Sequence, residues 1–268
     1  MGQLSNRRAI TGLTEVGAIN GLSSDGNNLY VIPRNFAYRY SYDAQNGIIG
    51  SRVRVGRVSS FRGLGGNNVY VSDLSGQYKI LIGSITTDID DAVTGIHKVG
   101  NKIIISYGTS IANYRIHSTQ PVVSNRRFMG TVSGIDNITS LTVFGDKLLV
   151  AGNVNNTAIL FEMDYDLTTN TISNIEQVTG TFLQRSPLGM ATLNNKLIVY
   201  GALNDRFGIY DFDYTAVDLR TKTISDNITS SDSVGITVQH IPPKLFTDFL
   251  PYSDIISIDQ NQKSQIGH

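Results

Sequence analysis

Cysteine and tryptophan are absent from this chain of 268 residues, and glutamate occurs only at Glu15, Glu162 and Glu176. The lack of cysteine excludes disulfide bonds, thiolate metal sites and a cysteine nucleophile. Lysine is sparse, whereas asparagine, serine, threonine, glycine, valine, isoleucine and tyrosine are plentiful. Because helix formers are scarce and strand and turn formers are abundant, the composition favours an all-β fold.

An excess of one charge sign and long apolar runs are lacking as well. The chain has 22 basic and 22 acidic residues, and its only basic doublets are Arg7-Arg8 and Arg126-Arg127. A nucleic-acid-binding protein normally carries a basic stripe, so we expect no nucleic-acid partner. No run is long enough to span a bilayer and no secretory signal is visible, so we expect no membrane insertion. These features leave the localisation open.

The strongest feature that is present is an internal repeat. Five segments share a turn of glycine, asparagine or aspartate followed by a short apolar strand: Gly26–Val31, Gly66–Val71, Gly100–Ile105, Gly145–Val150 and Asn194–Val199. The strands begin at residues 29, 69, 103, 148 and 197, which gives steps of 40, 34, 45 and 49 residues. Steps of this length with short strands predict the four-stranded blades of a β-propeller.

Each repeat can be divided into the four strands of one blade. A first strand leads into the glycine- or asparagine-containing turn, where residues that tolerate positive φ form a tight hairpin with the apolar second strand. An aromatic-rich third strand follows, for example Phe36–Tyr40, Ala158–Phe161 and Phe207–Tyr210, and a fourth strand completes the blade. In two units the likeness is longer, since Phe161–Tyr165 parallels Tyr210–Tyr214. The alternative architecture is a β-sandwich or an irregular barrel built from similar hairpins.

The number of blades is predicted as six within a single domain of residues 1–268. Val234–Val238 has the place of a sixth inner strand, and a strand near Ala9–Leu13 would complete that last blade. Sharing one blade between the two terminal regions closes the ring and removes exposed strand edges. The alternative is five blades followed by a C-terminal extension.

The units between Asn20 and Val238 resemble β-propeller repeats in general. They lack the Trp-Asp ending of WD40 repeats and the glycine pair and tryptophan of kelch repeats. The resemblance therefore implies an architecture and assigns no function. The composition is similar to that of phage tail and other virion proteins, some of which contain propeller modules.

Candidate binding residues lie in the loops that lead into the inner strands and in those between second and third strands. Aromatic and arginine side chains are typical anchors of partner recognition, and those candidates are Arg34, Phe61, Arg62, Phe182, Arg185 and Arg206. Five aspartates are expected near the entrance of the central channel: Asp88, Asp90, Asp91, Asp136 and Asp232. Two carboxyl groups at the proper separation could hydrolyse a glycosidic bond, but capping of turns is the simpler role for them.

The function predicted from these features is that of a non-catalytic interaction or structural module. Such a module, for example in a phage or virion tail or surface, would dock to a protein of its assembly or recognise a host surface through its loop face. The alternative is a glycan-binding or glycan-hydrolysing propeller with Asp136 and Asp232 at the channel mouth. No catalytic motif, metal site or cofactor motif is visible, so we expect no catalytic residue and no cofactor.

Overall fold

The structure is a computed structural model that describes residues 1–13, 19–25, 27–33, 36–57, 61–64, 69–74, 77–82, 85–89, 92–120, 122–180, 187–203 and 206–216. For the strand residues between 55 and 86, and for 187, 202–203 and 206–207, only the backbone is described. All these residues belong to one compact unit, Met1–Arg220. The described part of the chain contains strands and no helix, as the composition predicts.

The strands form five sheets of four, which we call blades 1 to 5. Blade 1 contains β2 (Ile19–Ser24), β3 (Asn28–Pro33), β4 (Phe36–Asp43) and β5 (Ile48–Arg57). Blade 2 contains β6 (Phe61–Leu64), β7 (Val69–Leu74), β8 (Gln77–Ile82) and β9 (Ile85–Ile89). Blade 3 contains β10 (Val93–Val99), β11 (Lys102–Tyr107), β12 (Ser110–Ile116) and β13 (Val123–Thr131). Blade 4 contains β14 (Asn137–Phe144), β15 (Lys147–Val154), β16 (Thr157–Asp166) and β17 (Thr171–Gln177). Blade 5 contains β18 (Pro187–Leu193), β19 (Lys196–Leu203), β20 (Arg206–Ala216) and β1 (Gly2–Ala9).

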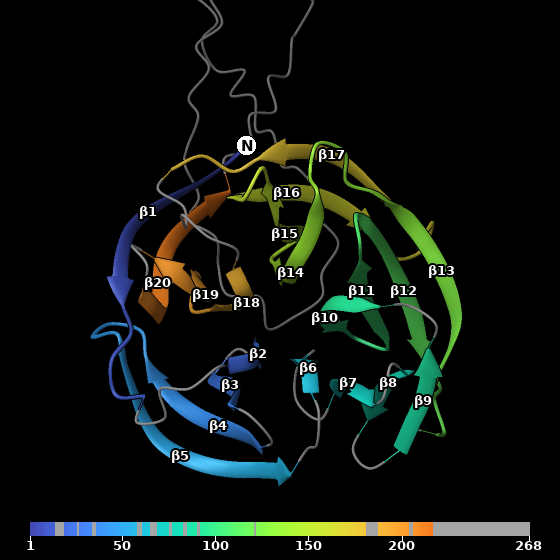
Figure 1. The fold of residues 1–268 in the computed structure, drawn as a ribbon, viewed down its shortest axis with the longest axis horizontal. Coiled ribbons are helices and arrows are strands. Elements are labelled where there is room, and N and C mark those ends of the chain that lie inside the picture. Colours follow the sequence, from blue (N-terminus) through green and yellow to red (C-terminus); the bar gives the residue numbers. More distant parts are fainter. Residues whose placement is uncertain are drawn as a thin grey trace, which may run out of the picture. The chain divides into compact units, whose positions relative to one another are not determined.

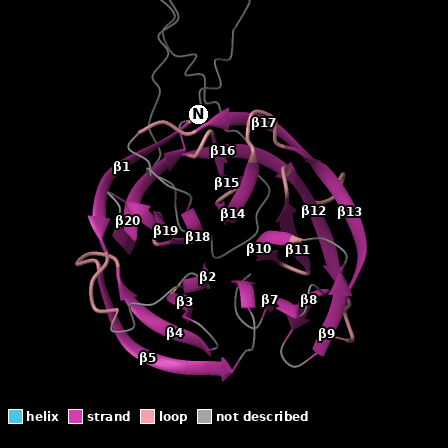
Figure 2. Cartoon of the chain, in the orientation of Figure 1, coloured by secondary structure: helices cyan, strands magenta, loops and turns pink. Residues whose placement is uncertain are grey.

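The blades of this unit are arranged in a closed ring (Figure 1). The first strand of each blade is innermost, and β2, β6, β10, β14 and β18 each contact the next, with β18 returning to β2 (Figure 2). The β-propeller architecture is therefore confirmed. The favoured count of six blades is wrong, because the ring closes with five sheets and leaves no gap for another. The residues assigned to a sixth blade, 234–258, lie outside the described residues.

An N-terminal strand closes the ring, although it is not the segment predicted for that role. β1 pairs with β20 from Gly2 opposite Ala216 to Ala9 opposite Tyr210, whereas the prediction placed the closing strand at Ala9–Leu13. Burial alternates along the start of β1, with Gly2 and Leu4 buried and Gln3 and Ser5 exposed. This period of two is what a strand packed on one face requires. Closure by an outer strand leaves blade 5 without a free edge at β20.

The predicted repeat corresponds to the hairpin between the first two strands of each blade. Gly100, Gly145, Asn194 and Asn195 adopt φ of 57°, 58°, 52° and 58°, the left-handed region that glycine and asparagine tolerate best. The apolar strands that follow are the second strands, and their central residues are fully buried, for example at Ile103–Ile105. They read as continuous apolar runs because both faces of each blade pack against neighbouring blades.

A second repeat, in the innermost strands, was not found in the sequence. Each of these strands is bulged immediately before a small residue: Gly21, Gly63, Gly95, Ser140 or Gly189. A Cβ atom on Gly95 would lie 2.8 Å from the backbone nitrogen of Leu141, and one on Gly189 would lie 3.0 Å from Leu22 Cβ. The small residue thus lets adjacent innermost strands approach closely around the ring.

Candidate functional site

The predicted binding residues lie mainly where the structure gives no side chain. Four of them, Arg34, Phe182, Arg185 and Asp232, lie outside the described residues. The backbone of Phe61 and Arg62 begins innermost strand β6, and that of Arg206 begins β20. Antiparallel pairing places the starts of innermost strands and the turns between second and third strands at one end of the ring, which we call the mouth end.

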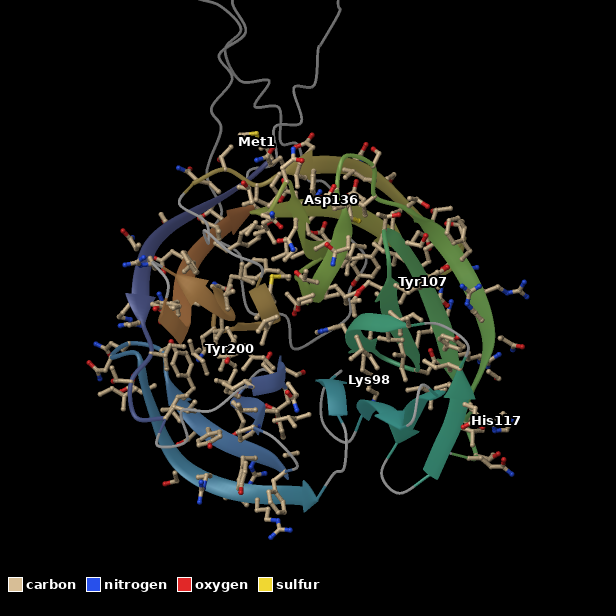
Figure 3. The ribbon with its side chains drawn as sticks, viewed as in Figure 1. Met1, Lys98, Tyr107, His117, Asp136 and Tyr200 are labelled. Carbon is tan, nitrogen blue, oxygen red and sulfur yellow. The ribbon has the colours of Figure 1, made fainter. Side chains whose placement is uncertain are left out.

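Among the candidate binding residues, Asp136 is the one whose side chain is described (Figure 3). It lies at the mouth end, directly before β14, and is exposed. Its carboxylate accepts a hydrogen bond from the backbone N–H of Asn155 at 2.9 Å, and its own N–H donates to the Asn153 carbonyl at 2.7 Å. Asp136 therefore caps the adjacent turn, as aspartates commonly do.

Asp88 does not lie at the channel entrance, and that expectation is wrong. It belongs to β9, the outermost strand of blade 2, where its backbone pairs with Lys79. The alternating segment Ile85–Ile89 forms a fourth strand instead of a loop between blades. Asp90 and Asp91 lie outside the described residues.

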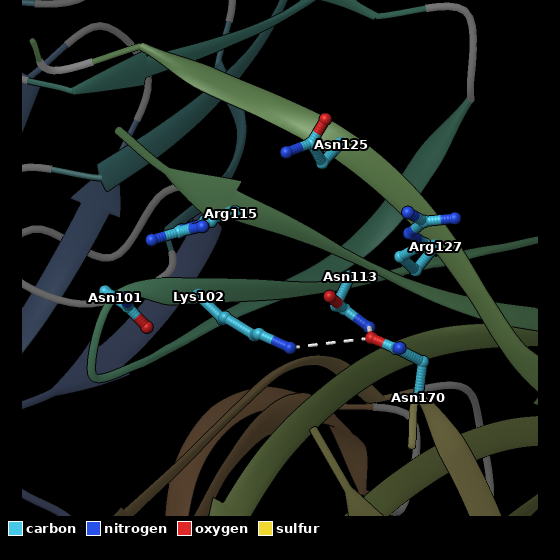
Figure 4. Close-up of a pocket in the computed structure, with 7 residues that line it drawn as sticks. All are labelled: Asn101, Lys102, Asn113, Arg115, Asn125, Arg127 and Asn170. Carbon is cyan, nitrogen blue, oxygen red and sulfur yellow. Dashed lines mark hydrogen bonds between the residues drawn. The ribbon is translucent and has the colours of Figure 1, made fainter. Parts of the chain in front are cut away.

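A pocket of about 270 Å³ lies at the end of the ring opposite the mouth (Figure 4). Its seven lining residues are all polar: Asn101, Lys102, Asn113, Arg115, Asn125, Arg127 and Asn170. Six of them belong to blade 3, and Asn170 comes from the turn between β16 and β17 of blade 4. The pocket thus sits between two blades, on the side that the loop-based prediction did not consider.

Strand register explains why these side chains share one face of blade 3. Lys102 pairs with Arg115 between β11 and β12, and Asn113 pairs with Arg127 between β12 and β13. A bulge in β13 includes Asn125, whose φ is 54°. Residues two apart on a strand point to the same face, so Asn113 and Arg115 are neighbours there.

The contacts inside the pocket involve neutral acceptors. Lys102 Nζ donates to the Leu167 carbonyl and lies 3.5 Å from Asn170 Oδ1. The same Asn170 oxygen accepts a hydrogen bond of 3.0 Å from Nδ2 of Asn113, a side chain that is only 1% exposed. Figure 4 shows the side chain of Lys102 extended toward Asn170. Because these acceptors carry no charge, the ammonium keeps its positive charge uncompensated.

The pocket therefore has a marked excess of positive charge. Lys102, Arg115 and Arg127 line it together with four asparagines, and no carboxylate of a described residue lines it. Among the described residues, none of these three cations forms an ion pair. Arg115 and Arg127 are exposed and Lys102 is half-buried. Cationic donors of this kind bind carboxylate, sulfate or phosphate oxygens, and asparagine amides both donate and accept hydrogen bonds.

Blades 4 and 5 have carboxylates at the position of Arg115. In blade 4, Lys147 Nζ lies 2.6 Å from Asp164 Oδ1, and Asn174 of the outer-strand bulge also donates to Asp164. Asp164 lowers the tendency of Lys147 to lose its proton, so the pKa of Lys147 is raised. The same arrangement of lysine, aspartate and asparagine therefore neutralises this end of blade 4.

Blade 5 repeats that arrangement. Lys196 forms an ion pair with Asp213, and Asn6 donates to Asp213 Oδ2 at 2.9 Å. These contacts, with the lysine first, lower the pKa of Asp213. The register is equivalent, since Lys196 pairs with Asp213 as Lys102 pairs with Arg115. Blade 3 thus carries a charge reversal at a position that blades 4 and 5 fill with aspartate.

A second carboxylate is also replaced in blade 3. Arg8 Nη2 lies 2.7 Å from Asp211, a fully buried residue that also accepts a hydrogen bond from Tyr42. Arg8 pairs with Asp211 as Arg127 pairs with Asn113. Burial, followed by the hydrogen bond to Asp211, raises the pKa of Tyr42. In blade 5, Asp211 links this sheet to blade 1 through its hydrogen bond from Tyr42. In blade 3 the equivalent residue is Asn113, whose side chain is an uncharged amide.

One sequence signal could have revealed this relationship. Ser5-Asn6-Arg7-Arg8 and Ser124-Asn125-Arg126-Arg127 are identical, and Ser173-Asn174 begins the same motif in blade 4. The two arginine doublets therefore occupy equivalent positions in two outer strands. Aligning them would have identified three outer strands, including the N-terminal one.

The described residues provide no other obvious site. No group of three or more histidine, cysteine, aspartate or glutamate residues that could hold a metal occurs among them. The described part of the chain also has no helix that is long and apolar enough to cross a membrane.

Comparisons with known proteins assign no function to this chain. No protein-family model and no curated protein matches the chain. A glutaminyl cyclase from Myxococcus xanthus is similar with a TM-score of 0.48 and 12% identity, over 80% of this chain and 97% of that one. The PQQ-bound aldose sugar dehydrogenase from Streptomyces coelicolor is similar with a TM-score of 0.46 and 12% identity, over 80% and 99%. Neither likeness transfers an activity to this chain, whose strand order and ring closure make it a β-propeller.

Proposed function

We propose that this propeller is a non-catalytic recognition module that binds an anionic ligand, or an anionic group of a partner, in the pocket of blade 3. The observation that carries the proposal is the substitution of Arg115 and Asn113 at positions where blade 5 has Asp213 and Asp211. The change leaves three cations without a carboxylate in a concave, polar site. Cations arranged in this way attract and orient oxyanions.

The roles of the two buried carboxylates among the described residues support a non-catalytic function. Asp211 is bound by Arg8 and Tyr42, and Glu162 accepts a hydrogen bond from Tyr214. A general acid or base has to exchange a proton with the substrate within hydrogen-bond reach. Asp211 and Glu162 are instead buried in contacts that join strands or blades.

The position of the pocket changes the surface through which docking is proposed. Loop-face recognition was expected at the mouth end, whereas the cationic pocket favours the opposite end, formed by turns between first and second and between third and fourth strands. Membership of a phage or virion assembly remains a proposal based on composition. A protein partner would need an acidic group that reaches the pocket.

The proposal can be tested by a screen of neutral and acidic saccharides for both binding and turnover. Three proteins would be compared: wild type, Arg115→Asp and Lys98→Asp. Arg115→Asp introduces the carboxylate of blades 4 and 5, and Lys98→Asp makes the same charge change at an exposed position of β10 (Figure 3). We expect wild type and Lys98→Asp to bind acidic ligands without turnover and Arg115→Asp to bind none.

The glycosidase alternative is tested in the same screen by Asp136→Asn. If Asp136 only caps a turn, this variant keeps the ligand profile of the wild type. Hydrolysis of a glycan by the wild type that Asp136→Asn abolishes would contradict the non-catalytic proposal and place chemistry at the mouth end.

A further inference from the structure

We propose that the group bound in the blade 3 pocket is a phosphate monoester on a small polyhydroxylated carrier, as in a sugar phosphate. This inference rests on the proposed function, because it specifies which anion the pocket recognises. It follows from the charge of the pocket, the geometry of its donors, its amides and its size.

Charge balance favours a phosphate monoester over a carboxylate. A phosphate monoester carries about −1.5 to −2 charges at neutral pH and offers three acceptor oxygens. A carboxylate carries one charge on two oxygens. Bound among Lys102, Arg115 and Arg127, a carboxylate would leave about two positive charges uncompensated, whereas a phosphate dianion would leave about one.

The donor types point to the same group. Arginine presents a planar fork of N–H donors that matches phosphate oxygens, and lysine binds phosphate as a point charge. Lys102 is already oriented by the Leu167 carbonyl and Asn170, both of them part of blade 4. A ligand in this pocket would therefore contact a cation whose position is set by the neighbouring blade.

The asparagines indicate a carrier with hydroxyl groups. Asn101, Asn113, Asn125 and Asn170 line the pocket, and each amide offers donors as well as acceptors. Hydroxyl groups use both kinds of partner, whereas an apolar carrier would offer no partner to the exposed amides of Asn101 and Asn125. The volume of about 270 Å³ lies just below the range of ~300–1,000 Å³ typical of drug-sized ligands, so the carrier is small.

Larger phosphate carriers fit the pocket less well. Single-stranded nucleic acid is bound by aromatic stacking platforms, and none of the described aromatic residues lines this pocket. Recognition of an anionic membrane surface usually takes ~4–8 clustered basic residues, whereas three line the pocket. A soluble, singly phosphorylated sugar is therefore the occupant that the observations favour.

Isothermal titration of the folded protein with five probes tests the inference: glucose 6-phosphate, glucose 6-sulfate, glucuronate, glucose and inorganic phosphate. We expect glucose 6-phosphate to bind about 10-fold or more tightly than glucuronate or glucose 6-sulfate, and glucose not to bind. Its affinity should fall between pH 7 and pH 5, because the phosphate gains its second proton near pH 6. The sulfate ester provides the control, since it does not titrate there.

The variants separate the inference from the proposed function. Arg115→Asp should weaken glucose 6-phosphate binding by about 30-fold or more, and Lys98→Asp should change it by less than about 3-fold. If glucuronate or glucose 6-sulfate binds as tightly as glucose 6-phosphate and Arg115→Asp abolishes it, the phosphate inference is overturned while anion recognition stands. If no anion binds, or if Arg115→Asp binds like the wild type, both proposals fail.

Discussion

Blades 3 and 5 have the same framework but differ in charge at one end, where blade 5 is balanced and blade 3 is positive. Both have a lysine at the start of the second strand and the same Ser-Asn-Arg-Arg motif in the outer strand. In blade 5, Lys196 forms an ion pair with Asp213, and Arg8 forms one with Asp211. In blade 3, Lys102 lies opposite Arg115 in the strand register, and Arg127 lies opposite Asn113. The comparison shows that the charged residues at one end of a blade can differ between blades while the buried strand residues remain apolar.

The difference in exposure explains which part can vary. The central second-strand residues Ile103–Ile105 and Leu197–Val199 are fully buried in both blades. A change of volume there creates a cavity or an overpacked core. Arg115 is exposed, so a change of its charge costs little stability and alters what the surface attracts.

Asp211→Asn gives the largest expected effect on stability, because it breaks the charged contact that blade 5 has and blade 3 lacks. Asp211 is fully buried and holds Arg8 and Tyr42. Loss of its charge should lower the free energy of unfolding by about 3 kcal/mol in a urea titration. The matched change Asn113→Asp gives Arg127 a carboxylate but removes the N–H that Asn113 donates to Asn170, so it should also lose stability, though less than Asp211→Asn. Equal losses in the two variants would contradict the distinction between the blades.

Acid should destabilise blade 3 through a residue that blade 5 does not have. Burial lowers the pKa of His97 to about 4, whereas the equivalent position in blade 5 holds Ala191. The unfolded chain gains the proton near pH 6.5, so stability falls between pH 6.5 and pH 4 by roughly 2 kcal/mol. His97→Thr, which copies Thr142 of blade 4, should flatten this part of the pH profile of thermal unfolding. An unchanged slope would show that other groups cause the loss.

Gly95→Ala tests the part of the framework that the blades share. The added Cβ would lie 2.8 Å from the Leu141 backbone nitrogen, so the two innermost strands have to move apart. We expect a loss of ~1–2 kcal/mol in chemical denaturation. Ser140→Ala in blade 4, where a side chain is already accommodated, is the control and should lose less. A neutral Gly95→Ala would mean that close approach of these strands is not required.

The smallest expected effect on stability belongs to Arg115→Asp, although this variant should abolish anion binding. The new carboxylate can pair with Lys102 as Asp164 pairs with Lys147. Exposed ion pairs contribute ~0–1 kcal/mol, so unfolding in urea should be unchanged or slightly shifted to higher concentration. A marked destabilisation would indicate that Arg115 has a structural role.

The strand framework could be predicted from the sequence because it depends on local chemistry. Turns such as Gly100-Asn101 and the apolar runs after them mark the first hairpin of each blade. The favoured count of six blades failed because ring closure is non-local. The motif shared by Ser5–Arg8 and Ser124–Arg127 marks the N-terminal segment as an outer strand, but nothing near Gly2 identifies Ala216 as its partner. The domain assignment of residues 1–268 remains a prediction.

The pocket could not be predicted from loops, because strand register creates it. Lys102, Arg115 and Arg127 are spread over 26 positions and meet only through the pairing of three strands. Asn170 joins them from another blade. Only the repeated Ser-Asn-Arg-Arg motif offered a local indication that these outer strands are equivalent.

The most direct test of the account is an NMR titration of ¹⁵N-labelled protein with glucose 6-phosphate, in which side-chain signals of arginine and asparagine are followed. The account predicts saturable chemical-shift changes at Arg115, Arg127 and Asn113 of blade 3. The signal of Arg8 in blade 5 should not change. Chemical-shift changes at the mouth end around Asp136, or none at all, would contradict the claim that the pocket of blade 3 binds the anion.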